Sequence, residues 1–399
     1  MRQTPLRSAG VLNLLATLIV GPQVLAQPPT AQDTVDADIN VDSVLWGVQP
    51  GGQAPSLLWQ NQAQLDLGVR LSPPAEPTQW RAQAAVRWRT SDPQQDPGPL
   101  IGSSGLFDPS DYGAGTGVRL MNLALAMDTE RVSLLAGWIQ PQQHFLQQPL
   151  SKLVLNHAVL SAKGVGGNIP FVSSFSTWGG LISWRPRNGG HIKAGAFMTY
   201  PDATASSNNG VWFGGNPNQP GTNRMGGLVE AARPIALGRQ RQPGLVAVGG
   251  YVYDGAGVPA TPTANQGTQV GGYLQWDQQL WSDPQGTGRR VDVFSVLSAA
   301  PAANNTYPLY GHLGLAMRGP LSTRPQDLLI TTVAMGAYAR AMPDAAATSS
   351  LISELGYQLA LDPQGHIALY PFAQWVVRPN GTANQPTAVL AGISARLRF

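Results

Sequence analysis

The chain ends in Thr387-Ala388-Val389-Leu390-Ala391-Gly392-Ile393-Ser394-Ala395-Arg396-Leu397-Arg398-Phe399, and this stretch decides the fold. Most of its odd positions are apolar, and most of its even positions are small or charged. Alternation with a period of two is typical of a β-strand that has one apolar face. A strand that closes the chain on a bulky aromatic residue is expected at the lipid boundary of an outer-membrane β-barrel, in the girdle of aromatic side chains.

The same alternation recurs in sixteen segments of the chain, most of them about as long as a tilted strand needs to cross a bilayer. The connections between them are alternately short and long, as in bacterial barrels with tight periplasmic turns and long outer loops. The sequence therefore predicts an all-β fold, a 16-stranded antiparallel transmembrane β-barrel with short periplasmic turns and long extracellular loops. The segments are 41–49, 57–72, 79–90, 118–128, 131–139, 178–185, 190–200, 224–233, 243–254, 268–281, 288–298, 311–319, 328–340, 350–362, 365–378 and 386–399.

The first residues have the pattern of an export signal. Arg2 and Arg7 precede an apolar run from Ala9 to Val20, and the small residue Ala26 follows. The run is shorter than the ~20 residues that a membrane-spanning helix needs. We therefore expect a signal peptide at 1–26, a short periplasmic segment at 27–40 and the barrel at 41–399, in the outer membrane of a Gram-negative cell.

Composition excludes several other classes of protein. The chain has no cysteine, so disulfides and thiolate metal sites are excluded. No segment after the signal approaches the ~18 uninterrupted apolar residues of a transmembrane helix, which leaves a barrel as the membrane-spanning form. Removal of Arg2 and Arg7 with the signal leaves basic and acidic residues nearly balanced, and we expect no nucleic-acid partner.

The two faces of each predicted strand differ in polarity. In residues 79–90, Trp80 and Trp88 lie on one face, and Arg81, Arg87 and Arg89 lie on the other. An arginine on the lipid face would cost roughly 2–4 kcal/mol near the bilayer midplane, so the arginines should face a wet lumen. By the same alternation, further inward side chains are Gln60, Gln62, Gln64, Asp66 and Arg70, then Glu354, Gln358 and Asp362, then His366, Tyr370, Phe372, Gln374 and Arg378.

Two long connections contain apolar residues that a solvated loop would not need. They are residues 91–117 and 140–177, and the second includes Phe145, Leu153 and Phe171. A barrel of this width leaves an aqueous channel unless something narrows it. We expect one or both connections to fold into the lumen, with 140–177 facing the arginine row of 79–90. Packing of the outer loops on each other is the alternative.

Several stretches resemble the carbohydrate-selective porins of the OprB type. Their order and spacing carry the resemblance, which covers the chain from about Trp46 to Phe399. The stretches are 119–123, 134–138, Leu155-Asn156, Trp178-Gly179-Gly180, 193–197, 319–327, 354–359, 370–375 and 378–381. The resemblance implies a 16-stranded outer-membrane porin that passes mono- and oligosaccharides. The chain departs from the family at Phe372, where the family more often has an acid, and at Asn122, where it often has Glu, which implies a less negative lumen.

Sugars present many hydroxyl groups and an apolar ring face, so a sugar channel needs charged and amide side chains together with aromatic ones. Binding must also stay weak enough for the solute to leave. Candidate residues of the substrate pathway are Asp66, Arg81, Arg87, Arg89, Asn122, Glu354, Gln358, Tyr370 and Gln374. A non-selective general porin would have a lumen of the same residue types. Because inward Asp277, Glu354 and Asp362 partly offset the arginines, we expect only mild ion selectivity.

Enzymatic readings have little support. The histidines are scattered without metal-ligand spacing, and His191 near Ser183 is the only nucleophile–base candidate. We expect no enzyme activity, no cofactor and no metal. A structural or adhesive barrel with a plugged lumen, or a secreted glycan-binding β-sandwich, remain as alternatives.

The expected partners follow from the barrel interpretation. They are permeating sugars, outer-membrane lipid and the barrel assembly machinery, which would read the C-terminal strand ending in Phe399. The sequence leaves monomer and trimer open.

Overall fold

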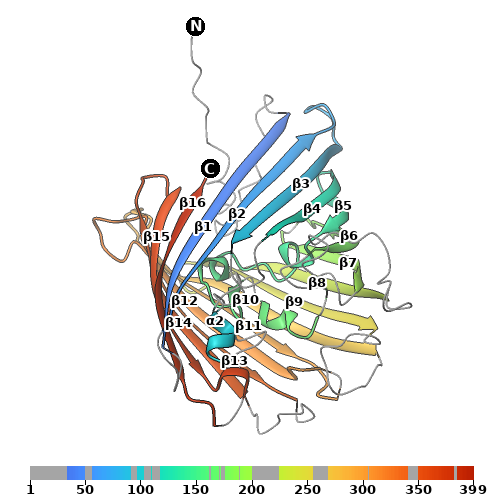
Figure 1. Ribbon diagram of the computed structural model, residues 1–399. Coiled ribbons are helices and arrows are strands. Elements are labelled where there is room, and N and C mark those ends of the chain that lie inside the picture. The colour runs from blue at the N-terminus through green and yellow to red at the C-terminus, as the bar shows by residue number, and fades with distance from the viewer. Residues whose placement is uncertain are drawn as a thin grey trace.

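The computed structural model is a closed barrel of sixteen antiparallel strands (Figure 1). Each strand pairs with its neighbours in sequence, and β1 pairs with β16 to close the sheet. The predicted 16-stranded barrel is therefore confirmed, and the β-sandwich alternative is excluded.

The structure describes residues 34–49, 56–90, 97–102, 109, 117–160, 163–169, 171, 176–187, 189–199, 224–254, 268–303, 305–339, 349–381 and 384–399. The predicted signal peptide at 1–26 lies outside the described residues, as does most of the 91–117 connection. Within the described part, no helix is long and apolar enough to cross a membrane.

The strands coincide with the predicted segments to within a few residues at most ends. They are β1 Val35–Gln49, β2 Ser56–Arg70, β3 Gln79–Thr90, β4 Gly117–Asp128, β5 Val132–Ile139, β6 Thr177–Trp184, β7 His191–Thr199, β8 Arg224–Leu237, β9 Gln242–Asp254, β10 Thr268–Ser282, β11 Arg290–Ala299, β12 Leu309–Arg318, β13 Leu328–Ala337, β14 Ser349–Ala360, β15 Ile367–Val377 and β16 Ala388–Arg398.

The largest difference is at the start of β1, which begins at Val35 instead of residue 41. Val35 and Ile39 are exposed on the outer face. Asp38 lies opposite Asp66 in the backbone pairing of β1 with β2. The alternation therefore continues through these residues. The acidic residues between the apolar ones made this stretch look like a solvated segment in the sequence.

The last residue of the chain takes part in barrel closure. The backbone N–H of Phe399 donates to the carbonyl oxygen of Ile39 at 2.8 Å, and the N–H of Ile39 donates to the carbonyl oxygen of Phe399 at 2.7 Å. The side chain of Phe399 is 56% exposed, as expected for an aromatic residue at the rim of a lipid-facing surface.

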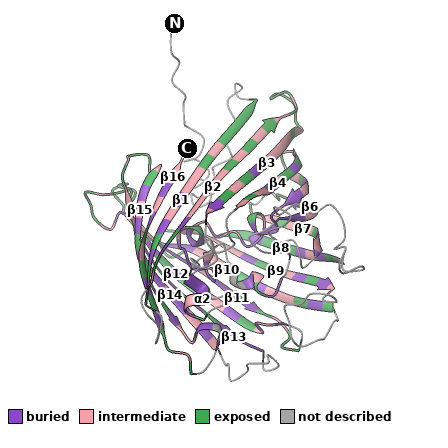
Figure 2. Cartoon of the chain, in the orientation of Figure 1, coloured by how far each residue is buried: buried purple, intermediate pink, exposed green. Residues whose placement is uncertain are grey.

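The outer face of the barrel is apolar. Large hydrophobic side chains are exposed along the strands, for example Leu57 at 73% and Trp59 at 59% (Figure 2). On a soluble protein so many exposed apolar side chains would be an aggregation liability, whereas a transmembrane barrel presents such a band to lipid.

On the inner face, aromatic rings lie over glycines of neighbouring strands. The ring of Tyr370 lies over Gly356, where an added Cβ would come within 2.1 Å of the ring. Phe372 covers Gly392 in the same way, with an added Cβ 2.7 Å from its ring. The glycines leave room for these rings to lie against the wall, and they fix the direction in which the hydroxyl group of Tyr370 points.

The connections also alternate between short and long, as predicted. The short turns, at 71–78, 129–131, 185–190, 238–241, 283–289, 319–327 and 361–366, lie at the end of the barrel that holds the C-terminus, at the top of Figure 1. At the other end, the connection from β5 to β6 spans residues 140–176.

The assignment of faces predicts how one strand tolerates charge. Val86 is exposed on the outer face of β3, and Gln83 lies on the inner face of the same strand. Val86→Arg should lower the free energy of unfolding, measured for the protein folded in lipid vesicles, by roughly 2–4 kcal/mol. The reason is that the guanidinium would lie in the hydrocarbon of the bilayer. Gln83→Arg, the matched control, should change it far less, and equal destabilisation by the two variants would contradict the assigned faces.

Candidate functional site

The described residues of the connection from β5 to β6, called the inner loop below, lie inside the barrel. It contains the short helices η2 Pro141–Gln143, η3 Leu150–Leu153 and α3 Lys163–Gly166, which are drawn within the barrel in Figure 1. The inward folding expected for residues 140–177 is therefore confirmed for the described residues.

Apolar side chains of the inner loop pack against the barrel wall. Phe145, Val154 and Leu155 are almost completely buried. Phe145 meets Phe197 of β7 edge to face, with ring centroids 6.1 Å apart, and Phe171 stacks on Phe197 with ring centroids 5.8 Å apart. This burial provides the packing partner that the sequence indicated these residues would need.

The carboxylate of Glu354 on β14 holds the middle of the inner loop. It accepts backbone N–H groups of Leu155 at 3.0 Å and Asn156 at 2.9 Å, and the side-chain amide of Asn156 at 2.8 Å. Tyr370 donates its hydroxyl to the same carboxylate at 2.7 Å, and Gln374 donates its amide at 2.9 Å. Hydrogen bonds to a charged group contribute about 1.5–3 kcal/mol each, so this carboxylate is a strong anchor.

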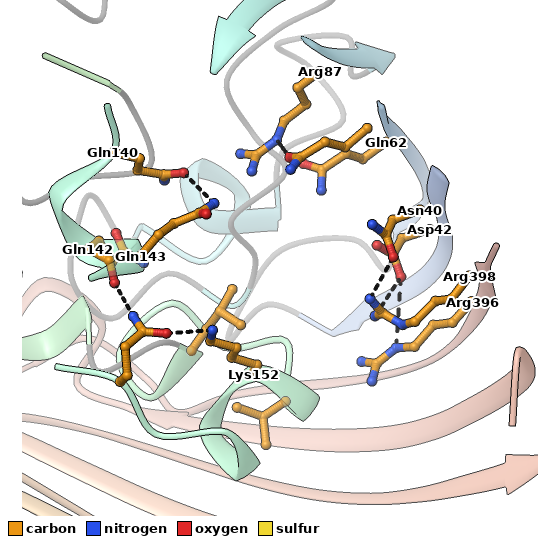
Figure 3. Close-up of a pocket in the computed structure, with 14 residues that line it drawn as sticks. Asn40, Asp42, Gln62, Arg87, Gln140, Gln142, Gln143, Lys152, Arg396 and Arg398 are labelled. Atoms are coloured by element: carbon orange, nitrogen blue, oxygen red, sulfur yellow. Dashed lines mark hydrogen bonds and ion pairs between the residues drawn. The ribbon is translucent and has the colours of Figure 1, made fainter. Parts of the chain in front are cut away.

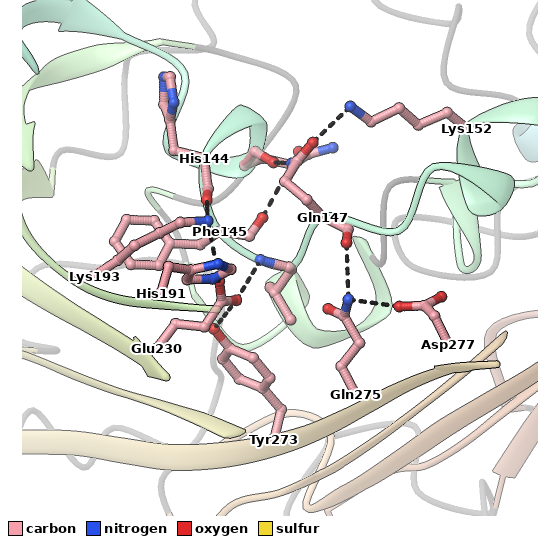
Figure 4. A network of polar contacts seen from close by, with 12 residues as sticks. His144, Phe145, Gln147, Lys152, His191, Lys193, Glu230, Tyr273, Gln275 and Asp277 are labelled. Carbon is pink, nitrogen blue, oxygen red and sulfur yellow. Dashed lines mark hydrogen bonds and ion pairs between the residues drawn. The ribbon is translucent and has the colours of Figure 1, made fainter. Parts of the chain in front are cut away.

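A second carboxylate, that of Glu230 on β8, holds the start of the inner loop (Figure 4). It accepts the backbone N–H of Leu146 and the hydroxyl of Tyr273, both at 2.9 Å. On the wall it contacts His191 at 2.9 Å and Lys193 at 3.3 Å. Leu146 has a positive φ of 58°, a backbone conformation that costs a non-glycine residue roughly 1–2 kcal/mol, and its bond to Glu230 helps to hold it there.

Further contacts join the inner loop to β10, β11 and β12. His312 contacts the side-chain oxygen of Gln148 at 2.7 Å, and Gln148 in turn donates to the backbone oxygen of Ser295 at 2.9 Å. The hydroxyl of Tyr310 donates to the backbone oxygen of Ala158 at 2.8 Å. The loop is thus fixed to the side of the wall formed by β7 to β15, and the pore lies on its other side.

The space between the inner loop and the opposite wall is a polar cavity of about 340 Å³ (Figure 3). The inner loop contributes several glutamines and one lysine, and strands β1, β2, β3 and β16 contribute arginines, amides and one acid. Its lining residues are Asn40, Asp42, Gln62, Gln64, Arg87, Gln140, Gln142, Gln143, Gln147, Lys152, Val154, Leu160, Arg396 and Arg398. This cavity is the candidate functional site, and its volume is within the range of small-molecule sites.

Neighbouring glutamines orient the arginines of β3. Arg87 donates from Nε to the side-chain oxygen of Gln64 at 2.8 Å, and Arg89 donates to that of Gln62 at 2.7 Å. Each bond sets the direction of its guanidinium, which carries several N–H donors in a fixed planar arrangement.

The charge of the cavity comes from arginine and lysine rather than histidine. His144 lies on the inner loop, where burial and the neighbouring Lys193 and Lys152 lower its pKa to about 4. Its imidazole is therefore neutral at neutral pH. Asp277 and Glu354, two acids predicted to offset the charge of the arginines, are both bonded to the inner loop and do not line the cavity.

The structure brings four of the predicted pathway residues together on one wall. Arg87 lines the cavity, and Arg89 is buried beside it. Both carboxylate oxygens of Asp66 accept the side-chain amide of Gln64 at 2.9 Å, and the side-chain amide of Asn122 donates to Gln83 at 3.4 Å.

The other predicted residues lie elsewhere in the barrel. Arg81 pairs with Arg70, nearer the end with the short turns. Glu354, Tyr370 and Gln374 meet behind the inner loop, where each is at most 1% exposed. Gln358 lies in the last part of β14, paired with Leu328.

Several residues of the site were not among the predicted pathway residues. The glutamines of the inner loop and Lys152 were visible as an amide-rich stretch, but no sequence rule says which side of a loop faces a pore. Glu230 could have been found as the single acid at an inward position of β8. His191 is bonded to Glu230, and among the described residues no group of three or more His, Asp or Glu side chains is placed to hold a metal ion.

Comparison with known proteins gives a consistent picture. The family model described as carbohydrate-selective porin, OprB family, matches residues 100–399. A comparison with curated protein sequences finds no match.

Solved structures show the same fold. The high-pH structure of Pseudomonas putida OprB matches with a TM-score of 0.77 at 17% identity, over 92% of this chain and 94% of that chain. The low-pH structure of the same protein matches with a TM-score of 0.55 at 12% identity, over 92% and 93%. Acinetobacter baumannii OccAB4 matches with a TM-score of 0.51 at 8% identity, over 93% and 99%.

The anchoring of the inner loop predicts a change in channel behaviour. Glu354→Gln should replace a carboxylate oxygen with an amide group that faces the N–H groups of Leu155 and Asn156. Loss of two charge-assisted bonds should raise the population of channels with a displaced loop by roughly tenfold or more, since ~1.4 kcal/mol corresponds to a factor of ten. Single-channel recordings at neutral pH should show more frequent events of higher conductance.

The matched control is Glu130→Gln, because the Glu130 side chain is 88% exposed in the turn before β5. It should leave the recordings unchanged. Identical traces for Glu354→Gln and the parent would mean that the loop is held without this carboxylate.

Proposed function

Because the chain belongs to the OprB family of carbohydrate-selective porins, and is therefore a sugar-diffusing porin of the outer membrane, we propose that sugars cross the barrel at the cavity between the inner loop and strands β1, β2, β3 and β16. The family consists of porins rather than enzymes. Mono- and oligosaccharides are the proposed solutes, and the cavity is the narrow step of their path.

The observation that carries this proposal is the chemistry of the two walls. The inner loop offers amide side chains such as Gln143 and Gln147, and the facing strands offer Arg87 together with Gln62 and Gln64. These groups can exchange bonds to water for bonds to sugar hydroxyls. Water can form the same hydrogen bonds with these side chains, so a sugar binds only weakly and can leave the cavity.

We assign two roles to the residues predicted from the sequence. Arg87, Arg89, Asp66 and Asn122 lie on or beside the pore wall and act on the solute or orient the groups that do. Glu354, together with Tyr370 and Gln374, keeps the inner loop in place and so sets the width of the pore. Arg81 and Gln358 lie on the wall towards the short-turn end, where they would meet the solute after the constriction.

A non-selective diffusion porin is the alternative function. An open pore of sixteen strands would fit it, but here a structured loop fills one side of the lumen and leaves a lined cavity. Saturable block of ion current by sugars distinguishes the two, because a non-selective pore has no site to saturate.

For export and assembly we propose cleavage of a signal peptide at 1–26 and recognition of the C-terminal strand by the barrel assembly machinery. The position of Phe399 supports the second part, since its backbone pairs with Ile39 at the barrel seam and its ring faces outward.

The sugar pathway can be tested in planar bilayers. Arg87→Ala should weaken sugar block of the ion current by roughly tenfold, because it removes charge-assisted hydrogen bonds from the cavity wall. Removing residues 149–153 of the inner loop should raise the conductance and weaken the block. Arg131→Ala, in the turn before β5, is the control for loss of an arginine and should leave the block unchanged.

If sugars block both the Arg87 variant and the shortened loop as strongly as the parent, the constriction lies elsewhere. The 91–117 connection would then be the next candidate, since Gln374 donates to the backbone oxygen of Pro109 at 3.1 Å.

Assembly can be tested through the last residue. Deleting Phe399 should lower the amount of heat-modifiable protein in the outer membrane several-fold, because the deletion removes both the terminal aromatic ring and the last backbone pair with Ile39. Val389→Ala, which removes an outward apolar side chain from the same strand, is the control. Unchanged outer-membrane levels after the deletion would contradict the proposed recognition.

A further inference from the structure

The cavity is lined by an excess of positive charge. Arg87, Lys152, Arg396 and Arg398 line it, and Asp42 is its single carboxylate. Neutral sugars need no such excess, since amide side chains can also bind hydroxyl groups. The imbalance therefore points to something more specific about the solute.

The single carboxylate is shared between two arginines. Asp42 lies 4.0 Å from Nε of Arg396 and 3.8 Å from Nη2 of Arg398, as Figure 3 shows on one side of the cavity. Arg398 also donates to the side-chain oxygen of Asn40 at 3.1 Å. Both contacts of Asp42 are longer than a charge-assisted hydrogen bond, so the carboxylate is placed between the arginines without satisfying either.

Arg396 is the less satisfied of the two. Its side chain is only 5% exposed, and its Nε and Nη1 atoms are buried without an acceptor at hydrogen-bond distance. The guanidinium lies 4.4 Å above the ring of Tyr370, which orients it but accepts no N–H bond in the ring plane. A buried guanidinium that lacks acceptors is costly, and a second carboxylate in the adjoining cavity would lower that cost.

The remaining lining suits a polyhydroxylated ring. Gln140, Gln142 and Gln143 place amides on the inner-loop side, and the side-chain oxygen of Gln142 is buried without a donor. Leu160, which is partly exposed, supplies a small apolar surface against which a ring face can lie. The cavity thus combines cationic groups on one side with amides and aliphatic side chains on the other.

We propose that the constriction selects sugar acids, monosaccharides that carry one carboxylate, over neutral sugars of the same size. The carboxylate lies beside Arg396 and Arg398, and the ring hydroxyls face the glutamines of the inner loop and Lys152. This proposal rests on the proposed function, because it names the solute class of the same cavity.

The test compares five probes on the purified full-length protein in planar bilayers at neutral pH. They are galacturonate, its uncharged methyl ester, galactose, galactose 6-phosphate and acetate. Galacturonate should block the ion current at roughly tenfold lower concentration than galactose or the ester, the factor expected from one added charge-assisted interaction. Acetate should block no better than galactose, since it lacks the hydroxyl groups that the amides bind.

Two variants distinguish the effect of losing a positive charge in the cavity from an effect on the fold of the barrel. Arg396→Gln should reduce block by galacturonate about tenfold and reduce block by galactose much less. Because Arg396 lies at the barrel seam, Lys152→Gln on the inner loop serves as a second variant with an exposed side chain, and it should shift galacturonate block in the same direction. Arg131→Gln, outside the cavity, should change neither.

Each contrary outcome has a distinct meaning. Equal block by galacturonate, its ester and galactose would overturn the acid preference and leave the sugar-porin function intact. Acetate blocking as well as galacturonate would show a site for anions in general, which also overturns the proposal. A stronger block by galactose 6-phosphate than by galacturonate would overturn the assignment to a carboxylate. No block and no permeation by any sugar would instead contradict the proposed function itself.

Discussion

The constriction depends on two carboxylates that accept backbone N–H groups of a loop folded into the barrel. Glu354 binds the loop at Leu155 and Asn156, and Glu230 binds it at Leu146. A loop inside a lumen has no strand partner for its backbone, and buried donors without acceptors are costly. An ionised carboxylate can satisfy several donors at once, and its own charge is stabilised by the same bonds. The loop therefore supplies N–H donors and the wall supplies carboxylate acceptors. Removing either set of groups would leave the other buried and unpaired.

This arrangement divides the barrel wall into two parts. Strands β7 to β15 carry aromatic rings and acids that hold the inner loop, and rings such as Tyr370 lie flat because glycines such as Gly356 make room for them. Strands β1, β2, β3 and β16 contribute arginines and amides to the lining of the cavity. Glu230 and Glu354 are engaged in contacts with the inner loop, whereas Arg87, Lys152, Arg396 and Arg398 line the cavity. The positive character of the constriction thus follows from how the loop is held.

The same division relates stability to transport. On the anchoring side, buried charges are surrounded by donors, which makes the contacts strong and geometrically fixed. On the pore side, Lys152 and Arg87 line the cavity, and in the proposed pathway their contacts with a solute would compete with hydration. Transport needs such weak and exchangeable contacts, and it also needs a pore width that does not change. The barrel meets both needs because different residues provide them.

The sequence by itself determined the membrane-spanning barrel, the number of its strands, the two faces of each strand and the family. These properties follow from period-two alternation, from loop lengths and from local motifs, all of which are read along the chain. Alternation placed Arg87, Glu354 and Tyr370 on the inner face, but it could not separate a side chain at the pore from one beneath a loop. Only the tertiary structure decided that Glu354 anchors the inner loop, that Glu230 does so as well, and that Arg396 and Lys152 meet across one cavity. The physical reason is that these contacts join residues far apart in the chain, and closure of the barrel together with the path of one loop sets the distances between them.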